Sequence, residues 1–135
     1  MTANELPEGV TCRVFEGDEL IFESGSHWLH PLFELGAYLK EHPEHKRKDL
    51  SLQDRIIGRA AALMIARLGI KHCSTPVVSE RALPIFEGEK IELNYESTTP
   101  CLPCKTEEIL AQETNPAQAW ALLEERARKA AEARR

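Results

Sequence analysis

The sequence predicts an α/β protein, a three-layer α/β/α sandwich around one mixed sheet. Three observations predict this class. Residues 11–23 alternate between apolar and polar side chains on either side of a Gly-Asp turn, the pattern of a β-hairpin. Residues 54–68 (DRIIGRAAALMIARL) include ten apolar residues out of fifteen, which is typical of a helix covered on most sides. Residues 71–95 predict a strand, a helix and a second strand, which implies a parallel pair with a right-handed crossover.

Length and composition limit the classes of protein that the chain can be. Its 135 residues carry a net charge of −5 and 42% hydrophobic residues, so we expect one globular core and no general affinity for nucleic acid, which favours basic surfaces. No apolar run approaches the roughly 20 residues of a membrane span. The polar, acidic start lacks the pattern of a signal peptide. We therefore expect a cytoplasmic protein that does not enter a membrane.

The central helix has a clear start and stop in the sequence. Asp54 is a favourable N-cap, and Gly69 is a favourable residue for ending the helix. The charged segment 42–49 before it is expected to be a solvated loop, and the alternative is a phosphate-binding basic loop. Periodicity and turn residues place the other elements: strands at 11–15, 19–23, 71–79 and 90–95, and helices at 31–41, 80–86, 104–112 and 117–135.

The chain is expected to have three parts. Residues 1–10 are a flexible, polar lead-in, residues 11–112 are the α/β domain, and residues 113–135 are a helical extension. The extension is rich in alanine and charged residues after a short apolar face. We expect its last turns either to fray or to pack on a second copy of the chain, which would form a homo-oligomer.

The carboxyl ends of the parallel strands are the expected position of a ligand site. The start of the central helix should lie there, because that helix leads into the strand over 71–79. The strand over 90–95 should end at the same edge. Helix N-termini at this edge favour an anionic group on a small-molecule ligand. The candidate catalytic residues are Asp54, Glu80 and Cys104, and the candidate ligand-binding residues are Ser79, Cys101 and Glu107.

Two of the four cysteines have CxxC spacing, in Cys101-Leu-Pro-Cys104. This spacing occurs in redox pairs and as half of a zinc site. His72 and Cys73 could complete such a site by type. However, they begin the strand over 71–79, and about seven residues at roughly 3.3 Å each separate its two ends. We therefore expect no metal and no cofactor, and a nucleophilic role for Cys104 stays open.

Three segments resemble a known family. They read Asp54-Arg-Ile-Ile-Gly58-Arg-Ala-Ala-Ala62, Val77-Val-Ser79-Glu80-Arg-Ala82-Leu83 and Cys104-Lys-Thr-Glu107. In this order they are similar to an acidic residue before a Gly-x-Ala-Ala-Ala helix, a Ser-Glu after the next strand, and a Cys-Pro-Met-Glu segment. These features resemble the uncharacterised proteins grouped as domain of unknown function 1893. Lys105-Thr106 departs from the Pro-Met of that family, and the C-terminal helix is an addition.

The resemblance implies the cytidine-deaminase-like fold but not deaminase chemistry. Zinc deaminases carry H-x-E at the start of the central helix and P-C-x-x-C at the start of the next helix. Here the corresponding segments read Asp54-Arg-Ile56 and Ser79-Glu80-Arg-Ala82. The leading hypothesis is a non-zinc domain that binds a small, nucleotide-like or anionic ligand. A zinc-dependent deaminase with remodelled ligands and a non-catalytic binding or regulatory module are the alternatives.

Overall fold

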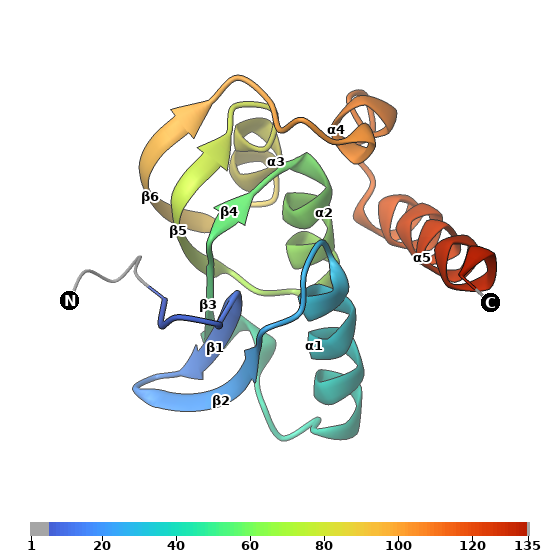
Figure 1. The fold of residues 1–135 in the computed structure, drawn as a ribbon. Coiled ribbons are helices and arrows are strands. Elements are labelled where there is room, and N and C mark those ends of the chain that lie inside the picture. The colour runs from blue at the N-terminus through green and yellow to red at the C-terminus, as the bar shows by residue number, and fades with distance from the viewer. Residues whose placement is uncertain (1–5, 135) are drawn as a thin grey trace.

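A computed structural model describes residues 6–134 of the chain as one mixed sheet packed against helices (Figure 1). The order of strands and helices follows the predicted order, with two additional short strands before the central helix. The elements are β1 (Cys12–Glu16), β2 (Glu19–Ser24), α1 (His30–Glu41), a 3₁₀ turn (Arg47–Asp49), β3 (Leu50–Asp54), β4 (Ile56–Ile57), α2 (Arg59–Leu68), β5 (His72–Ser79), α3 (Leu83–Gly88), β6 (Glu92–Thr99), α4 (Lys105–Ile109) and α5 (Pro116–Ala133).

The six-stranded sheet combines an antiparallel and a parallel half. β1 pairs antiparallel with β2 and with β3, whereas β3, β4 and β6 all pair parallel with β5. β3 and β4 lie along the same edge of β5, because Ser51 pairs with His72 and Ile56 with Val77 at a constant offset. They therefore form one strand line that is interrupted at Arg55. The parallel strands end at a common edge, as the sequence predicted.

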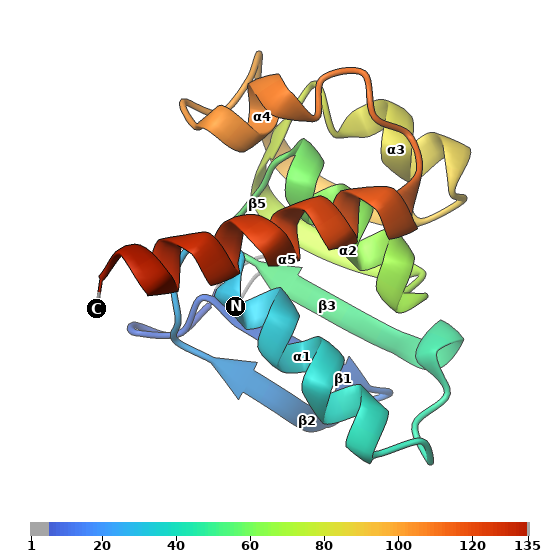
Figure 2. The same cartoon turned by 90° about the vertical axis from the view of Figure 1, so that its right-hand side faces the viewer.

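Helices α1, α2 and α3 cover one face of the sheet, and α5 crosses over α1 and α2 as an outer layer (Figures 1 and 2). Among residues 6–134, no helix covers the opposite face of the sheet in these views (Figures 1 and 2). None of the eight residues of β6 is buried, and six of them are exposed. The predicted α/β sandwich with a mixed sheet is confirmed. Its third layer is α5 rather than helices on the opposite face.

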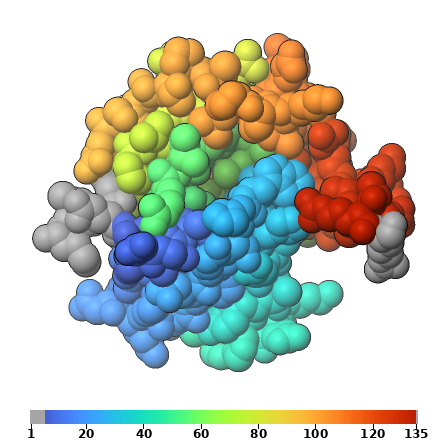
Figure 3. All heavy atoms as spheres, in the orientation of Figure 1, coloured from blue at the N-terminus to red at the C-terminus, as the bar shows by residue number. Residues whose placement is uncertain are grey.

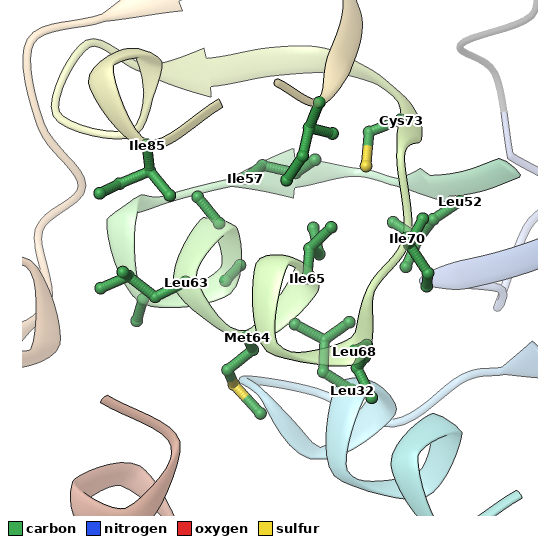
Figure 4. Packing of buried hydrophobic residues seen from close by; sticks show 14 of the residues in the cluster. Leu32, Leu52, Ile57, Leu63, Met64, Ile65, Leu68, Ile70, Cys73 and Ile85 are labelled. Carbon is green, nitrogen blue, oxygen red and sulfur yellow. The ribbon is translucent and has the colours of Figure 1, made fainter. Parts of the chain in front are cut away.

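The core lies around α2, which is buried along almost its whole length (Figure 4). Leu63, Met64 and Ile65 are completely buried between the sheet and the neighbouring helices. At about 25 cal/mol per Å² of apolar surface, side chains of this size each contribute roughly 1.5–3 kcal/mol by burial. Within residues 6–134, no helix is both long and apolar enough to cross a membrane.

The predicted start of the central helix is wrong by four residues. Asp54 is the last residue of β3, and the N-cap of α2 is Gly58. The segment from Leu50 to Asp54 forms a strand because Leu50 and Leu52 face the core in alternation and the backbone pairs on both sides, with β1 and β5. The predicted stop is confirmed, since Gly69 has a left-handed conformation (φ 80°).

The C-terminal extension is part of the fold. The predicted helix is confirmed as α5, and Ala119 and Leu123 on it are buried. The Trp120 ring lies edge-on to Phe33 of α1, at 5.3 Å between centroids. The first half of the predicted lead-in lies outside the described residues, and in its second half the carbonyls of Pro7 and Val10 accept hydrogen bonds from Arg55.

A buried arginine joins α2 to the C-terminal part of the chain. Arg59 is 6% exposed, and its guanidinium donates to three backbone carbonyls. They belong to Leu110 (2.6 Å), Arg81 (2.8 Å) and Glu113 (2.6 Å). The side chain therefore links the start of α2 to the turn before α3 and to the segment between α4 and α5.

We expect Arg59→Met to lower the free energy of unfolding by about 2–5 kcal/mol, because three buried carbonyls lose a charged donor. Arg67→Met is the matched control, since Arg67 lies on the same helix and is exposed, and it should change stability by less than about 0.5 kcal/mol. Urea denaturation measures both variants. Equal losses in the two variants would contradict the linking role of Arg59.

Candidate functional site

A cavity of about 280 Å³ lies at the carboxyl edge of the β3–β4 line, beside the start of α2. We call it the inner cavity. Its wall combines the end of β3 (Asp54), the segment before α1 (His27 and Trp28) and the segment that leads into α4 (Cys104 and Glu107). Apolar side chains and the start of α2 complete the lining. Three of the six predicted site residues therefore meet here.

Asp54 is a half-buried acid in the inner cavity. Burial raises the pKa of its carboxyl from the usual 3.8 to about 7, against the opposing effect of hydrogen bonds from the backbone N–H groups of Arg55 and Ile56. The N–H of Arg55 donates to Asp54 Oδ1 at 2.7 Å. A carboxyl with this pKa is populated in both protonation states near neutral pH, which suits general acid–base work.

Glu107 is a buried acid on the opposite part of the wall. Its side chain is 2% exposed, and the N–H of Leu102 donates to its Oε1 at 3.2 Å. Among the residues described, its Oε2 is the buried side-chain oxygen that has no hydrogen-bond partner. An unpaired buried acceptor costs about 1–3 kcal/mol. Such an atom in the lining of a cavity can accept a hydrogen bond from a bound molecule or from water.

Gly58 allows Glu107 to approach the start of α2. A β-carbon at Gly58 would lie 2.9 Å from Glu107 Oε1 and 2.5 Å from Leu102 Cδ1. Distances this short do not occur between real side chains, so another residue at position 58 would displace this part of the wall. This close contact with Leu102 and Glu107 explains why position 58, directly before the central helix, is a glycine.

Cys104 lies at the rim of the inner cavity as the N-cap of α4. Its Sγ is 3.1 Å from the Oγ1 of Thr106, which is buried. Cys104 is exposed, so the thiol is open to reagents and to a bound ligand. Thr106 therefore supplies a polar neighbour to this thiol.

The other three predicted site residues lie outside the inner cavity. Ser79 is completely buried, and its Oγ accepts from the N–H of Arg81, as in a turn. Glu80 is exposed at the end of β5, where Thr98 Oγ1 lies 3.5 Å from its carboxylate. Cys101 is exposed and lines a separate shallow hollow with Arg81. The common sheet edge was predicted correctly. These three residues nevertheless do not reach the inner cavity, because Ser79 is buried in the fold and Glu80 and Cys101 are exposed elsewhere on the surface.

Trp28 was not among the predicted site residues. It is 45% exposed, lines the inner cavity and has a left-handed backbone conformation (φ 58°), which is strained for a bulky residue. Its ring meets His30 edge-on at 5.3 Å between centroids. The signal in the sequence was a tryptophan between two histidines, in a chain with only 6% aromatic residues.

The residues of this edge do not fit a zinc site of the deaminase type. α2 begins with Gly58, Arg59 and Ala60, and the turn before α3 contains Ser79 and Glu80, so neither helix start offers His or Cys. Nowhere between residues 6 and 134 do three His, Cys, Asp or Glu side chains gather in a way that could hold a metal ion.

The fold and the cavity define an α/β domain with a small, largely apolar pocket that contains two acids at the end of its parallel strands. The family model for domain of unknown function DUF1893 (TM1506) matches residues 2–127. The chain therefore belongs to the DUF1893 family, as the resemblance predicted.

A solved structure is similar across most of the chain. It is the crystal structure of a DUF1893 family protein (TM1506) from Thermotoga maritima at 2.70 Å resolution, with a TM-score of 0.74 and 19% sequence identity. The similarity covers 88% of this chain and 82% of that chain. No curated protein matches the sequence. At this identity the similarity shows a shared fold and says nothing of ligand or reaction.

Asp54 should make the stability of the protein depend on pH. Because its pKa is raised in the folded state, its contribution to stability is complete below about pH 4 and is lost as the pH rises through about 7. Asp54→Asn removes this dependence, so the variant should gain stability relative to the wild type between pH 5 and pH 8. The rise from 3.8 to about 7 limits the gain to about 4 kcal/mol.

Urea denaturation at the two pH values measures this difference. Asp18→Asn, in the exposed turn between β1 and β2, controls for the change in net charge. If the stability of Asp54→Asn changes with pH in parallel with the wild type, Asp54 is not the buried acid that the geometry indicates.

The four cysteines should divide into two classes toward a thiol reagent such as DTNB. Cys101 and Cys104 are exposed and should react within minutes, whereas Cys12 and Cys73 are buried, and burial raises the pKa of both. Two thiols should therefore react in the folded protein and four in denaturant. Cys101→Ala and Cys104→Ala should each remove one fast thiol, and a fast reaction that persists in the double variant would contradict this assignment.

Proposed function

We propose that the inner cavity binds a small, ring-shaped ligand that carries N–H donors, such as the base of a nucleoside or nucleotide, and that Asp54 exchanges a proton with it. The observation that carries this proposal is the unpaired, buried Oε2 of Glu107 in the same cavity as Asp54. A ligand N–H would complete the hydrogen bonding of Glu107. The protonated and ionised forms of Asp54 could then donate to or accept from a neighbouring ring atom.

The charges of the lining favour a donor-bearing ring over an anion inside the cavity. The two acids, Asp54 and Glu107, would repel an anionic group. Two arginines lie near this wall, but both are already engaged. Arg59 donates to three carbonyls, and Arg55 donates to the carbonyls of Pro7 and Val10.

The size and the apolar part of the lining support a ring. The volume of about 280 Å³ is near the lower end of the range for small-molecule sites, roughly 300–1,000 Å³. The exposed indole of Trp28 offers a face for stacking, worth roughly 1–3 kcal/mol per base by substitution in nucleic-acid proteins. Leu32 and Leu102 line the cavity and would contact the rest of a planar ligand.

Two residues supply the proposed chemistry. Asp54 acts as the general acid–base group, because its pKa is about 7. Cys104, at the rim, supplies an exposed thiol as the nucleophile: its addition to a C=C or C=N bond of the ring breaks the π bond, and protonated Asp54 gives the proton to the neighbouring ring atom. Glu80, Ser79 and Cys101 have no part in this cavity.

The cytidine-deaminase-like assignment of the fold is part of the proposal and rests on the sequence resemblance. Zinc-dependent deamination is not part of it, because the starts of α2 and α3 carry no His or Cys. A regulatory role through α5 alone is less well supported, because the apolar residues Ala119 and Leu123 of α5 are buried within the same chain.

Calorimetric titration with the four ribonucleosides tests the proposal. At least one should bind, and Glu107→Gln and Asp54→Asn should each weaken its affinity about tenfold or more, the usual effect of losing a hydrogen bond to a charged group. Glu80→Gln is the matched control, since it removes an acid from the same sheet edge but outside the cavity, and it should leave the affinity unchanged. Binding that is insensitive to Glu107→Gln would reject the cavity as the site.

A further inference from the structure

A second, wider cavity of about 610 Å³ adjoins the inner cavity. We call it the outer cavity. It lies between the segment before α1, the start of α4 and the C-terminal half of α5. Figure 3 shows these three segments in light blue, orange and red, next to one another on the face turned towards the viewer. Trp28, His27 and Cys104 line both cavities, so the two spaces meet at these residues.

The C-terminal half of α5 has no role in the core. The buried residues of this helix, Ala119 and Leu123, lie in its first half, and the helix continues to Ala133. Arg128 forms ion pairs with Glu125 and Glu132 on one stripe of this second half, and these pairs stabilise its helical conformation. A different stripe, which contains Arg126, lines the outer cavity. The helix therefore extends beyond its packing contacts and supplies a wall of this cavity.

The outer cavity is basic, whereas the inner cavity is lined by two acids, Asp54 and Glu107, and by two arginines that donate to backbone carbonyls. Lys105, Arg126 and Arg134 line it from two different elements. The acid in its lining is Glu34, whose carboxylate accepts hydrogen bonds from Ser24 Oγ (2.7 Å) and Ser26 Oγ (2.6 Å). These hydrogen bonds lower the pKa of Glu34 and hold its charge on the side of the hairpin. The formal charge of the lining, with neutral histidines, is +2.

We infer that the outer cavity binds the phosphate of a nucleoside phosphate whose base occupies the inner cavity. The inference rests on the proposed function and names its ligand class. The inner cavity receives the donor-bearing ring beside Asp54 and Glu107, and Lys105 and Arg126 bind the phosphate oxygens with charge-assisted hydrogen bonds. The net positive charge of the outer lining orients the ligand, because it attracts the phosphate away from the two acids of the inner cavity. Trp28 and His27, where the cavities meet, face the sugar.

Calorimetric titration with the four ribonucleosides, their 5′-monophosphates and inorganic phosphate tests this inference. A nucleoside that binds should bind at least about tenfold more tightly as its monophosphate, the gain expected from one or two charge-assisted contacts. Arg126→Gln and Lys105→Gln should each reduce this advantage, and the double variant should abolish it without changing the affinity for the nucleoside. Lys129→Gln removes the same charge from the ion-paired stripe of α5 and should leave both affinities unchanged.

The outcomes distinguish the two proposals. If nucleosides bind through Glu107 and the monophosphates bind no more tightly, the outer phosphate site is rejected and the inner site stands. If monophosphates bind through Arg126 and Lys105 but Glu107→Gln has no effect, the inner site is rejected and the phosphate site stands. Inorganic phosphate that binds as tightly as a monophosphate would reject the joint occupation of the two cavities. If none of the nine compounds binds, both proposals are rejected.

Discussion

The hydrogen bonds of Arg59 determine where the C-terminal third of the chain lies. A buried guanidinium requires acceptors, because an unpaired charge in the interior is very costly. Here three backbone carbonyls supply them, from the turn before α3 and from both ends of the segment between α4 and α5. These contacts hold α4 beside the start of α2. The position of Glu107, and with it the inner cavity, depends on this arrangement.

The inner cavity depends on the close approach of the segment before α4 to the start of α2. Gly58 permits Leu102 and Glu107 to lie directly against the start of α2. Asp54 remains in the cavity because β3 ends there and the strand line is interrupted before β4. Burial of the Asp54 carboxyl opposes its ionisation, as its raised pKa indicates, and Glu107 in the same lining has a buried oxygen without a partner among the described residues. Acids with such perturbed surroundings are typical of functional sites.

The two cavities differ in their charged side chains. Asp54 and Glu107 line the smaller inner cavity together with Arg55 and Arg59, whereas Lys105, Arg126 and Arg134 outnumber Glu34 in the larger outer one. The outer cavity gives the C-terminal half of α5 a place in the structure that packing does not provide, since one stripe of this half lines the cavity and another carries ion pairs.

The sequence by itself determined the order of the main strands and helices, the common edge of the parallel strands, and the proximity of Asp54 and Cys104 at that edge. Periodicity and topology are sufficient for these features, because they depend on neighbours along the chain. The strand Leu50–Asp54 was missed because its alternation is only four residues long beside a charged loop. Tertiary structure alone decided that Arg59 is buried, that Glu107 lacks a partner and that Trp28 lies between two cavities. Each of these depends on contacts between residues far apart in sequence, where burial and hydrogen bonding outweigh local preference.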